Sequence, residues 1–465
     1  MRLGEPQRRS KVPLFLVLGL FGLAMFTALG TISLRAGDQP KIQIESNLPA
    51  IGMETDISIK VSESKRGVEM VRVYLVQNKR EVQLGEVQGT VLPPYAVWSK
   101  SEEEVTLSYK IGRRAMPEIR EGKASIVVYA QPASTWLNQP AAATQVLTLP
   151  VRLKPPRIDL MSRDHFVTQG GAGAVRYRVG KTATRHGVTA GKWFFPGYQL
   201  PGAAPGEAFA FFAVPYDHGE NDEIKLFAID DVQNESSRVF LDSLTAKPSK
   251  KDKIKVSDRF MSIVVPRIKQ EVPEMPAQDS LVEEYVWINR ELRKQNDTKL
   301  KSLAATSTTA FLWNQRFMQM PAKVFSSFAD HRSYIYEGRE IDQQYHLGYD
   351  LASVKQADIP AANTGRVVMA EYLGIYGKTV VLDHGFGIMT LYGHMSSIDV
   401  QVGDMVTRGK VIGKTGATGL ALGDHLHFSV LIHGLSVRPL EWWDGKWINN
   451  RIASVIGDSL NYKLK

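Results

Sequence analysis

Two short segments near the C-terminus constrain the fold of this chain most. In the first, His346-Leu-Gly-Tyr-Asp350, polar and apolar side chains alternate, and the central glycine disfavours a helix. The alternation recurs in His425-Leu-His427-Phe-Ser429, where the two histidines would share one face. The pattern predicts two half-buried strands, each with an apolar face against a core and a polar face that carries imidazole or carboxylate groups.

The segment between these motifs predicts a β-hairpin. Residues Lys378–Leu382 and Ile388–Tyr392 are the strand candidates, the turn lies at His384, and His394 follows the second strand. Seven of the ten histidines lie after residue 330, which indicates a histidine-rich site in this part of the chain. We interpret His384 and His433 as surface or supporting residues rather than as ligands.

The residue types in these motifs suit a zinc site. Zinc takes imidazole nitrogens and carboxylate oxygens in tetrahedral geometry, and a catalytic site keeps one position for water. The cation lowers the pKa of that water, so that it becomes a nucleophile near neutral pH. Further histidines would act as general base and stabilise the developing charge. A metal-dependent hydrolase could be built from five residues: His346, Asp350, His394, His425 and His427.

With Leu-Tyr-Gly-His394 and the turn-rich stretch Val402–Gly413, these motifs resemble the lysostaphin-type (LytM-domain) zinc metallopeptidases, metallopeptidase family 23. The resemblance covers about residues 317–440. It implies that His346, Asp350 and His427 bind one zinc ion, and that His425 and His394 are the catalytic histidines. Some relatives place a tyrosine shortly before the first histidine to stabilise the oxyanion. Three tyrosines lie near that place, and the sequence does not choose among Tyr334, Tyr336 and Tyr345.

The function implied by the resemblance is hydrolysis of peptide cross-links in bacterial peptidoglycan. Relatives that only activate other cell-wall hydrolases usually lack part of the residue set, which is complete here. An active zinc endopeptidase is therefore expected. The alternative is a catalytically silent or autoinhibited LytM-type regulator of other cell-wall hydrolases.

The N-terminus predicts a membrane anchor. Residues 12–34 carry no charge over 23 positions, and a bilayer core needs about 20. The preceding basic residues should stay in the cytoplasm, which puts the bulk of the chain outside, on the periplasmic or cell-wall side. The alternative is a signal peptide cleaved near Ala28-Leu-Gly30, which would give a secreted protein.

The charge of the chain agrees with a place in the cell envelope. The net charge of +9 suits anionic partners, and the sequence contains no recognisable nucleic-acid-binding motif. Peptidoglycan, the membrane through the N-terminal helix, and envelope proteins through the β modules are the expected partners. The absence of cysteine excludes disulfides and cysteine zinc sites.

The rest of the chain predicts a mainly β protein. Short β-rich runs separated by turns indicate two β-sandwich-like modules that meet at Pro155-Pro156 and act as spacers or binding platforms. The lysine-rich stretch 247–255 is interpreted as a solvated linker or edge. A capping box, Ser280-Leu-Val-Glu283, predicts a helix over 280–303 that braces the catalytic module or covers its groove. After the catalytic module, the tail would pack through its tryptophans.

The expected organisation has six parts. They are a cytoplasmic tip and transmembrane anchor (1–36), a β-sandwich-like module (41–155), a second β-rich module (156–246), a linker and helix (247–309), an antiparallel β LytM-type peptidase domain with a duplicated hybrid motif (310–445), and a C-terminal tail (446–465).

Overall fold

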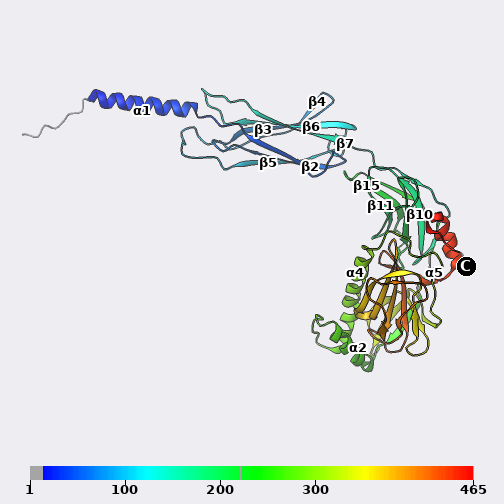
Figure 1. Ribbon diagram of the computed structural model, residues 1–465. Coiled ribbons are helices and arrows are strands. Elements are labelled where there is room, and N and C mark those ends of the chain that lie inside the picture. Colours follow the sequence, from blue (N-terminus) through cyan, green and yellow to red (C-terminus); the bar gives the residue numbers. More distant parts are fainter. Residues whose placement is uncertain (1–13, 220, 464–465) are drawn as a thin grey trace, which may run out of the picture. The chain divides into compact units, whose positions relative to one another are not determined.

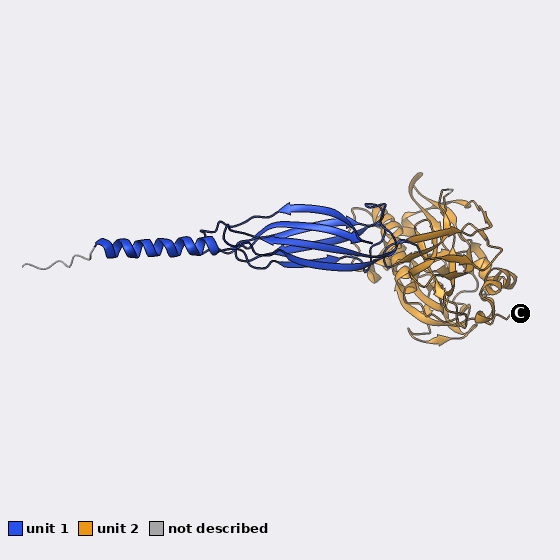
Figure 2. Cartoon of the chain, turned by 90° about the horizontal axis from the view of Figure 1, so that it is seen from above, with its two compact units in different colours: residues 1–155, 231–234 blue, residues 156–230, 235–465 orange. Residues whose placement is uncertain are grey.

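The computed structural model describes residues 14–219 and 221–463 (Figure 1). The chain divides into two compact units (Figure 2), one of residues 1–155 and 231–234 and one of residues 156–230 and 235–465. Strands dominate both units, which confirms the predicted mainly β class. The expected cytoplasmic tip, with its basic residues, lies outside the described residues.

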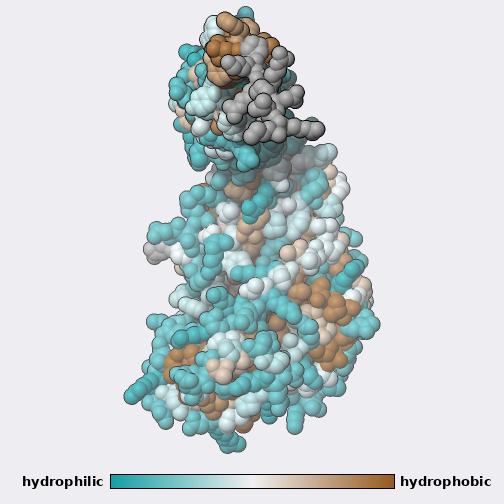
Figure 3. Space-filling view, turned by 90° about the vertical axis from the view of Figure 1, so that its left-hand side faces the viewer, coloured by the Kyte–Doolittle hydropathy of each residue, from teal (hydrophilic) through white to brown (hydrophobic). Residues whose placement is uncertain are grey.

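The first unit begins with the helix α1 (Leu14–Leu34), which is apolar and exposed along nearly its whole length. In the space-filling view its side chains form a brown patch at the top (Figure 3). At about 1.5 Å per residue its 21 residues are long enough to cross a bilayer core. Length and composition therefore allow a membrane span, and they also fit a signal sequence.

The β part of the first unit is a sandwich of two antiparallel sheets. One sheet has the order β1-β2-β5 and the other β4-β3-β6-β7. Alternate residues of each strand face the interior, where Ile57, Val73 and Ile126 are fully buried. The strands are β1 (Lys41–Ser46), β2 (Thr55–Ser62), β3 (Val68–Gln77), β4 (Arg80–Gln88), β5 (Glu104–Ile111), β6 (Gly122–Pro132) and β7 (Ala143–Val151).

The second β-rich module belongs to the second unit. It consists mainly of two four-stranded sheets, ordered β13-β14-β10-β8 and β12-β11-β15-β16. All seven residues of β14 are buried, because its strand lies inside a core that the module shares with the C-terminal part of the chain. Phe209 of β14, for example, lies 5.0 Å from Phe386, ring to ring. The strands are β8 (Ile158–Leu160), β10 (Ala172–Val179), β11 (Ala183–Ala190), β12 (Trp193–Pro196), β13 (Tyr198–Gln199), β14 (Glu207–Ala213), β15 (Ile224–Asp230) and β16 (Glu235–Val239), and a short parallel pair, β9 (Phe166–Thr168) and β17 (Ser243–Thr245), completes the module.

Of the two interpretations of the lysine-rich stretch, a solvated linker or an edge, the structure shows the edge. Its residues Lys251–Lys255 form β18, an edge strand that pairs in parallel with β20 (Asp330–Tyr336), which pairs with β21 (Arg339–His346). The lysines of β18 point to solvent, whereas Asp252 and Ile254 are half-buried. The lysine-rich composition indicated exposed side chains, which is what the structure shows. It could not indicate a strand, because the pairing partner β20 lies about 80 residues further along the chain.

Helices pack on one side of the C-terminal sheet. The predicted helix is confirmed from its cap: the Ser280 hydroxyl accepts a hydrogen bond from the Glu283 amide at 3.2 Å. The helix runs as α3 (Leu281–Trp287), a π-helical segment (Ile288–Leu292) and α4 (Arg293–Ala304). A further helix, α2 (Asp258–Glu271), was not predicted and contains Pro266. Buried side chains of these helices share a core with Leu373, Met389 and Leu431, so the helices brace the C-terminal module, as predicted.

The C-terminal module is built on one large antiparallel sheet. Its order is β19-β22-β30-β26-β25-β24-β28, with β31 paired to β30, and the predicted hairpin is confirmed as β25 and β26. A second sheet has the order β23-β29-β27. The strands are β19 (Lys323–Ser326), β22 (Tyr349–Ala352), β23 (Asp358–Pro360), β24 (Gly365–Leu373), β25 (Gly377–Gly385), β26 (Ile388–Met395), β27 (Ser397–Ile398), β28 (Met405–Val406), β29 (Val411–Lys414), β30 (Leu426–Ile432) and β31 (Leu435–Val437).

The C-terminal residues are helical rather than an irregular tail. They form α5 (Pro439–Trp443), α6 (Gly445–Ile448), a π-helical segment (Asn449–Ala453) and α7 (Ser454–Ile456), followed by a 3-10 turn (Gly457–Leu460). Trp442 and Trp443 are buried and Trp447 is half-buried, as predicted. Ile448 and Ile452 enter the core shared with the second β module.

We expect Glu441 of α5 to make the second unit pH-sensitive. Its carboxylate accepts a hydrogen bond from the Ala172 amide at 3.1 Å, and burial raises the pKa of Glu441 from 4.5 to about 7. A raised folded-state pKa gives stability that is complete below about pH 4.5 and is lost as the pH rises through about 7, a loss of up to about 3 kcal/mol.

Glu441→Gln keeps an acceptor and cannot ionise, so its free energy of unfolding should lack this decline. Denaturant titrations at pH 5 and pH 8 would measure it, with the exposed Glu274→Gln as control. An equal decline in Glu441→Gln and wild type would refute the assignment.

Candidate metal centre

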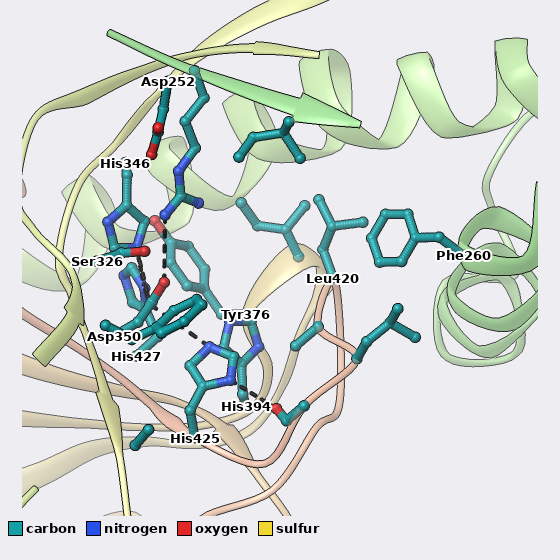
Figure 4. Close-up of a pocket in the computed structure, with 18 of the residues that line it drawn as sticks. Asp252, Phe260, Ser326, His346, Asp350, Tyr376, His394, Leu420, His425 and His427 are labelled. Carbon is teal, nitrogen blue, oxygen red and sulfur yellow. Dashed lines mark hydrogen bonds and ion pairs between the residues drawn. The ribbon is translucent and has the colours of Figure 1, made fainter. Parts of the chain in front are cut away.

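Three neighbouring strands and one strand end bring the five predicted residues together (Figure 4). Asp350 of β22 lies directly opposite His427 of β30, and His427 lies opposite Gly393 of β26, next to His394. His346 is the last residue of β21, and His425 immediately precedes β30. The sheet register therefore places all five side chains around one cavity.

The prediction of one continuous strand through His346 and Asp350 is wrong. β21 ends at His346 and β22 begins at Tyr349, so that Leu347 and Gly348 form a break. The break follows from close packing against β30. A Cβ atom at Gly348 would lie 2.5 Å from Nε2 of His427, and the Leu347 carbonyl accepts a hydrogen bond from the Ser429 hydroxyl at 2.8 Å.

Three donor atoms converge in the cavity. Nε2 of His346 lies 2.9 Å from Oδ1 of Asp350 and 3.1 Å from Nδ1 of His427, and the last two atoms are 3.1 Å apart. All three residues are buried. These separations are close to those of ligands around an ion bonded at about 2.0–2.1 Å, so the donor set fits zinc.

Hydrogen bonds on the far side of each ring leave the facing nitrogens unprotonated. The Ser327 carbonyl, 3.0 Å from Nδ1 of His346, can only accept, so that nitrogen carries the proton. The Ser429 hydroxyl donates to Leu347 and therefore accepts from Nε2 of His427, 3.1 Å away. Two lone pairs and a carboxylate oxygen then face one another, which is a stable arrangement around a cation.

The remaining two histidines line the same cavity beside the donor set. Nδ1 of His394 lies 2.8 Å from the Thr418 carbonyl and Nδ1 of His425 lies 2.7 Å from the Gly423 carbonyl, so both present an unprotonated Nε2. Their rings are 4.8 Å apart, and Nε2 of His425 is 3.7 Å from Oδ1 of Asp350. His394 also has a φ of +62°, a strained conformation for a residue with a Cβ atom.

Electrostatics favours the ionisation states that a metal needs. Burial would raise the pKa of Asp350, but His346 and His427 hold it well below its usual value. Burial lowers the pKa of His427 to about 4, and burial with the neighbouring histidines lowers that of His394 well below its usual value. At neutral pH the carboxylate is therefore charged and these two imidazoles are neutral.

Sequence reasoning missed several side chains of the cavity, among them Arg293, Arg332 and Tyr376. Arg332 of β20 places Nη2 3.4 Å from Oδ2 of Asp350, and its buried Nε has no hydrogen-bond partner among the described residues. The ring of Tyr376 lies 5.3 Å from that of His427. Tyr376 stands in Gly374-Ile-Tyr-Gly377, where both glycines have positive φ, and such a tight turn was the signal that could have drawn attention to it.

Of the three tyrosines considered from the sequence, Tyr334 lines the cavity. Tyr336 instead donates a hydrogen bond to Asp258 at 2.9 Å, and Tyr345 stacks on His331. The cavity has a volume of about 640 Å³. It extends from the donor set to an apolar end that includes Phe260 and Leu420 (Figure 4).

The surface position expected for His384 and His433 is wrong. His384 is fully buried in the core, where its nitrogens contact the Thr364 carbonyl and the Thr390 hydroxyl, both at 2.8 Å. His433 is half-buried and its ring stacks on Tyr198 of the second β module at 6.0 Å. Neither histidine lines the cavity of the donor set.

Together the antiparallel sheet and the His-Asp-His donor set define the class as a LytM-type domain. Residues 344–439 match the model of peptidase family M23. The chain therefore carries a peptidase family M23 domain at its C-terminus.

Three similar proteins illustrate the range of this family. The DD-carboxypeptidase/endopeptidase Mpg of Neisseria meningitidis is 36% identical over 95 residues, which are 20% of this chain and 22% of Mpg. The peptidoglycan DD-endopeptidase ShyA of Vibrio cholerae is 36% identical over 96 residues, 21% and 22% of the two chains. The murein hydrolase activator EnvC of Escherichia coli is 35% identical over 95 residues, 20% and 23%. The chain thus matches less than a quarter of the length of each relative.

The close approach at Gly348 predicts that Gly348→Ala weakens zinc binding. The added methyl group must displace the His427 ring, and changes in the residues that orient a ligand typically cost 10- to 100-fold in metal affinity. Competition with a chromophoric zinc chelator would measure the loss, and circular dichroism would show that the fold is kept.

Gly423→Ala is the matched control, since a Cβ atom there meets nothing within 4 Å. Wild-type zinc affinity in folded Gly348→Ala would contradict the placement of His427 as a ligand.

Proposed function

We propose that this protein is a zinc-dependent endopeptidase that hydrolyses peptide cross-links of peptidoglycan, anchored in the cell membrane with its catalytic module outside the cytoplasm. The convergence of Nε2 of His346, Oδ1 of Asp350 and Nδ1 of His427 is the observation that carries the proposal. When bound there, zinc would supply Lewis-acid activation of the scissile carbonyl and a lowered pKa for the attacking water.

The residues around the donor set would handle protons and charge. His425 and His394 each present an unprotonated Nε2 to the cavity, so each can accept the proton that the attacking water loses. The hydroxyl of Tyr376 stays protonated because burial raises its pKa, and it is therefore available to donate a hydrogen bond to the developing oxyanion.

The two arginines of the cavity indicate the kind of peptide. Guanidinium groups bind carboxylates strongly in partly buried sites, and Nε of Arg332 is unpartnered among the described residues. A peptide that bears a free carboxylate near the scissile bond would suit these guanidinium groups. The names of ShyA and Mpg specify DD activity, so we propose a D,D-cross-link as substrate.

Digestion of purified peptidoglycan tests the activity. We expect the zinc-loaded chain, in detergent, to release fragments that mass spectrometry identifies as cleaved cross-links, and a chelator to abolish the release. His425→Ala should keep its zinc and lose at least about 100-fold in turnover, as is typical for a general base. Wild-type rates in this variant would remove His425 from the mechanism.

The alternative function, a regulator of other cell-wall hydrolases, is favoured by one contact. Arg332 already pairs with Oδ2 of Asp350, and a counter-ion on this carboxylate would compete with a metal. The relative EnvC, named a murein hydrolase activator, is a precedent. A chain that binds zinc weakly and cleaves nothing, yet stimulates a second hydrolase, would support this function.

Arg332→Gln separates the two functions. If Arg332 binds a substrate carboxylate, the variant should keep its zinc affinity and lose about 10- to 100-fold in kcat/KM on carboxylate-bearing cross-links, the equivalent of one hydrogen bond to a charged group. If Arg332 is an inhibitory counter-ion, zinc affinity and cleavage should both rise. Arg339→Gln, an exposed position on β21, is the control.

A further inference from the structure

Large apolar side chains are exposed in two loops of the first unit. The loop between β4 and β5 exposes Tyr95, Val97 and Trp98, and the loop between β6 and β7 exposes Trp136 and Leu137. Trp98 is 81% exposed and Trp136 78%, although tryptophan is normally among the more buried residue types. We call these five residues the aromatic tip.

The loop between β6 and β7 is hydrogen-bonded to the C-terminal end of α1, and the loop between β4 and β5 to the next residue, Arg35. The Thr135 hydroxyl donates to the Ser33 carbonyl at 2.6 Å, and the Asn138 amide donates to the Leu34 carbonyl at 3.1 Å. The Trp136 indole N–H donates to the Ser33 hydroxyl at 3.3 Å. The Thr135 and Asn138 side chains thus bind two carbonyls at the end of the helix, where the intrahelical donors are missing.

The residues that follow α1 continue directly into the sandwich. The Arg35 guanidinium donates to the Ser99 carbonyl of the first loop at 2.7 Å, and the buried Arg66 donates to the Arg35 carbonyl at 3.0 Å. Ala36 is 1% exposed, and the Gly37 amide donates to the Ala133 carbonyl at 2.7 Å. The helix is thus joined to the sandwich through buried, hydrogen-bonded residues.

We propose that the aromatic tip is a membrane-contact surface, which seats in the headgroup region of the bilayer that α1 crosses. We choose the bilayer as the partner because the aromatic tip adjoins the apolar helix. The helix ends at Leu34, and the two loops bond to Leu34 and Arg35, so a helix that spans the bilayer would place them where it leaves the hydrocarbon. Tryptophan and tyrosine favour this level, because their rings are apolar and their N–H or O–H groups reach water.

The proposal rests on α1 being kept as an anchor, and it is independent of the peptidase activity. It also gives a physical reason to keep α1. Cleavage near Ala28 would remove most of the apolar helix, while the aromatic tip would remain exposed to water.

The absence of cysteine allows a direct test with single labels. Trp98→Cys and Leu137→Cys in the full chain would each carry an environment-sensitive fluorophore in vesicles of phosphatidylethanolamine and phosphatidylglycerol. Glu118→Cys is the matched control, since it is exposed at the opposite end of the same strands. Its distance from the tip is about 30 Å for strands of about ten residues.

We expect labels at 98 and 137 to emit at shorter wavelength than the label at 118, and to be quenched by lipids with a bromine near the headgroup. Equal emission at the three positions would overturn the proposal. Shielded labels that brominated lipids do not quench would also overturn it, because a protein surface would then cover the tip. A mature chain in cell membranes that lacks α1, seen by intact mass, would do the same, whereas failure to cleave peptidoglycan would leave these results unchanged.

Discussion

The pairing of β22, β30 and β26 is the constraint on which the rest of the C-terminal module depends. Asp350 and His427 can touch only because they are direct cross-strand partners, and His394 reaches the same cavity because its strand flanks β30 on the other side. A slip of one residue would turn every side chain of a strand to the opposite face. The buried partners Leu351, Leu426 and Phe428 prevent that slip, so that the core fixes the positions of the polar groups.

Holding three donor atoms within about 3 Å of one another is unfavourable without a cation, and the surrounding structure makes it possible. Carbonyl groups on the outer side of His346, His394 and His425 fix which nitrogen is protonated. Burial lowers the pKa of His427, so that its imidazole is neutral near pH 7 and no proton lies between it and Asp350. A metal bound there would meet donor atoms that the carbonyls and Ser429 already orient.

The sequence predicted those features of the fold and of the site that neighbouring residues encode, and it did not predict features that depend on contacts between distant segments. Alternation in two motifs identified four of the five residues, the predicted hairpin added His394, and the Ser280 cap identified the long helix. Period two did not reveal the break at Leu347-Gly348, because it results from contact with β30, about 80 residues away. β18 was missed for the same reason, since it pairs in parallel with β20, about 80 residues away. Arg332 was missed because only the folded chain brings its guanidinium to Asp350. The helix α2 was not predicted because a proline inside a helix is unfavourable, yet α2 contains Pro266.

The second β module shares a hydrophobic core with the C-terminal module, which does not fit the expected role of an independent spacer. An independent spacer would bury one face of each strand, yet every residue of β14 is buried, and the rings of Phe209, Phe311 and Phe386 pack together. Phe386 occupies the hairpin turn between β25 and β26, and β26 carries His394. Lys301 of α4 adds a contact to the ring of Trp193 at 4.0 Å. Because the module packs against both the hairpin and the bracing helices, it stabilises the walls of the cavity that holds the donor set, and it is a structural part of the C-terminal module.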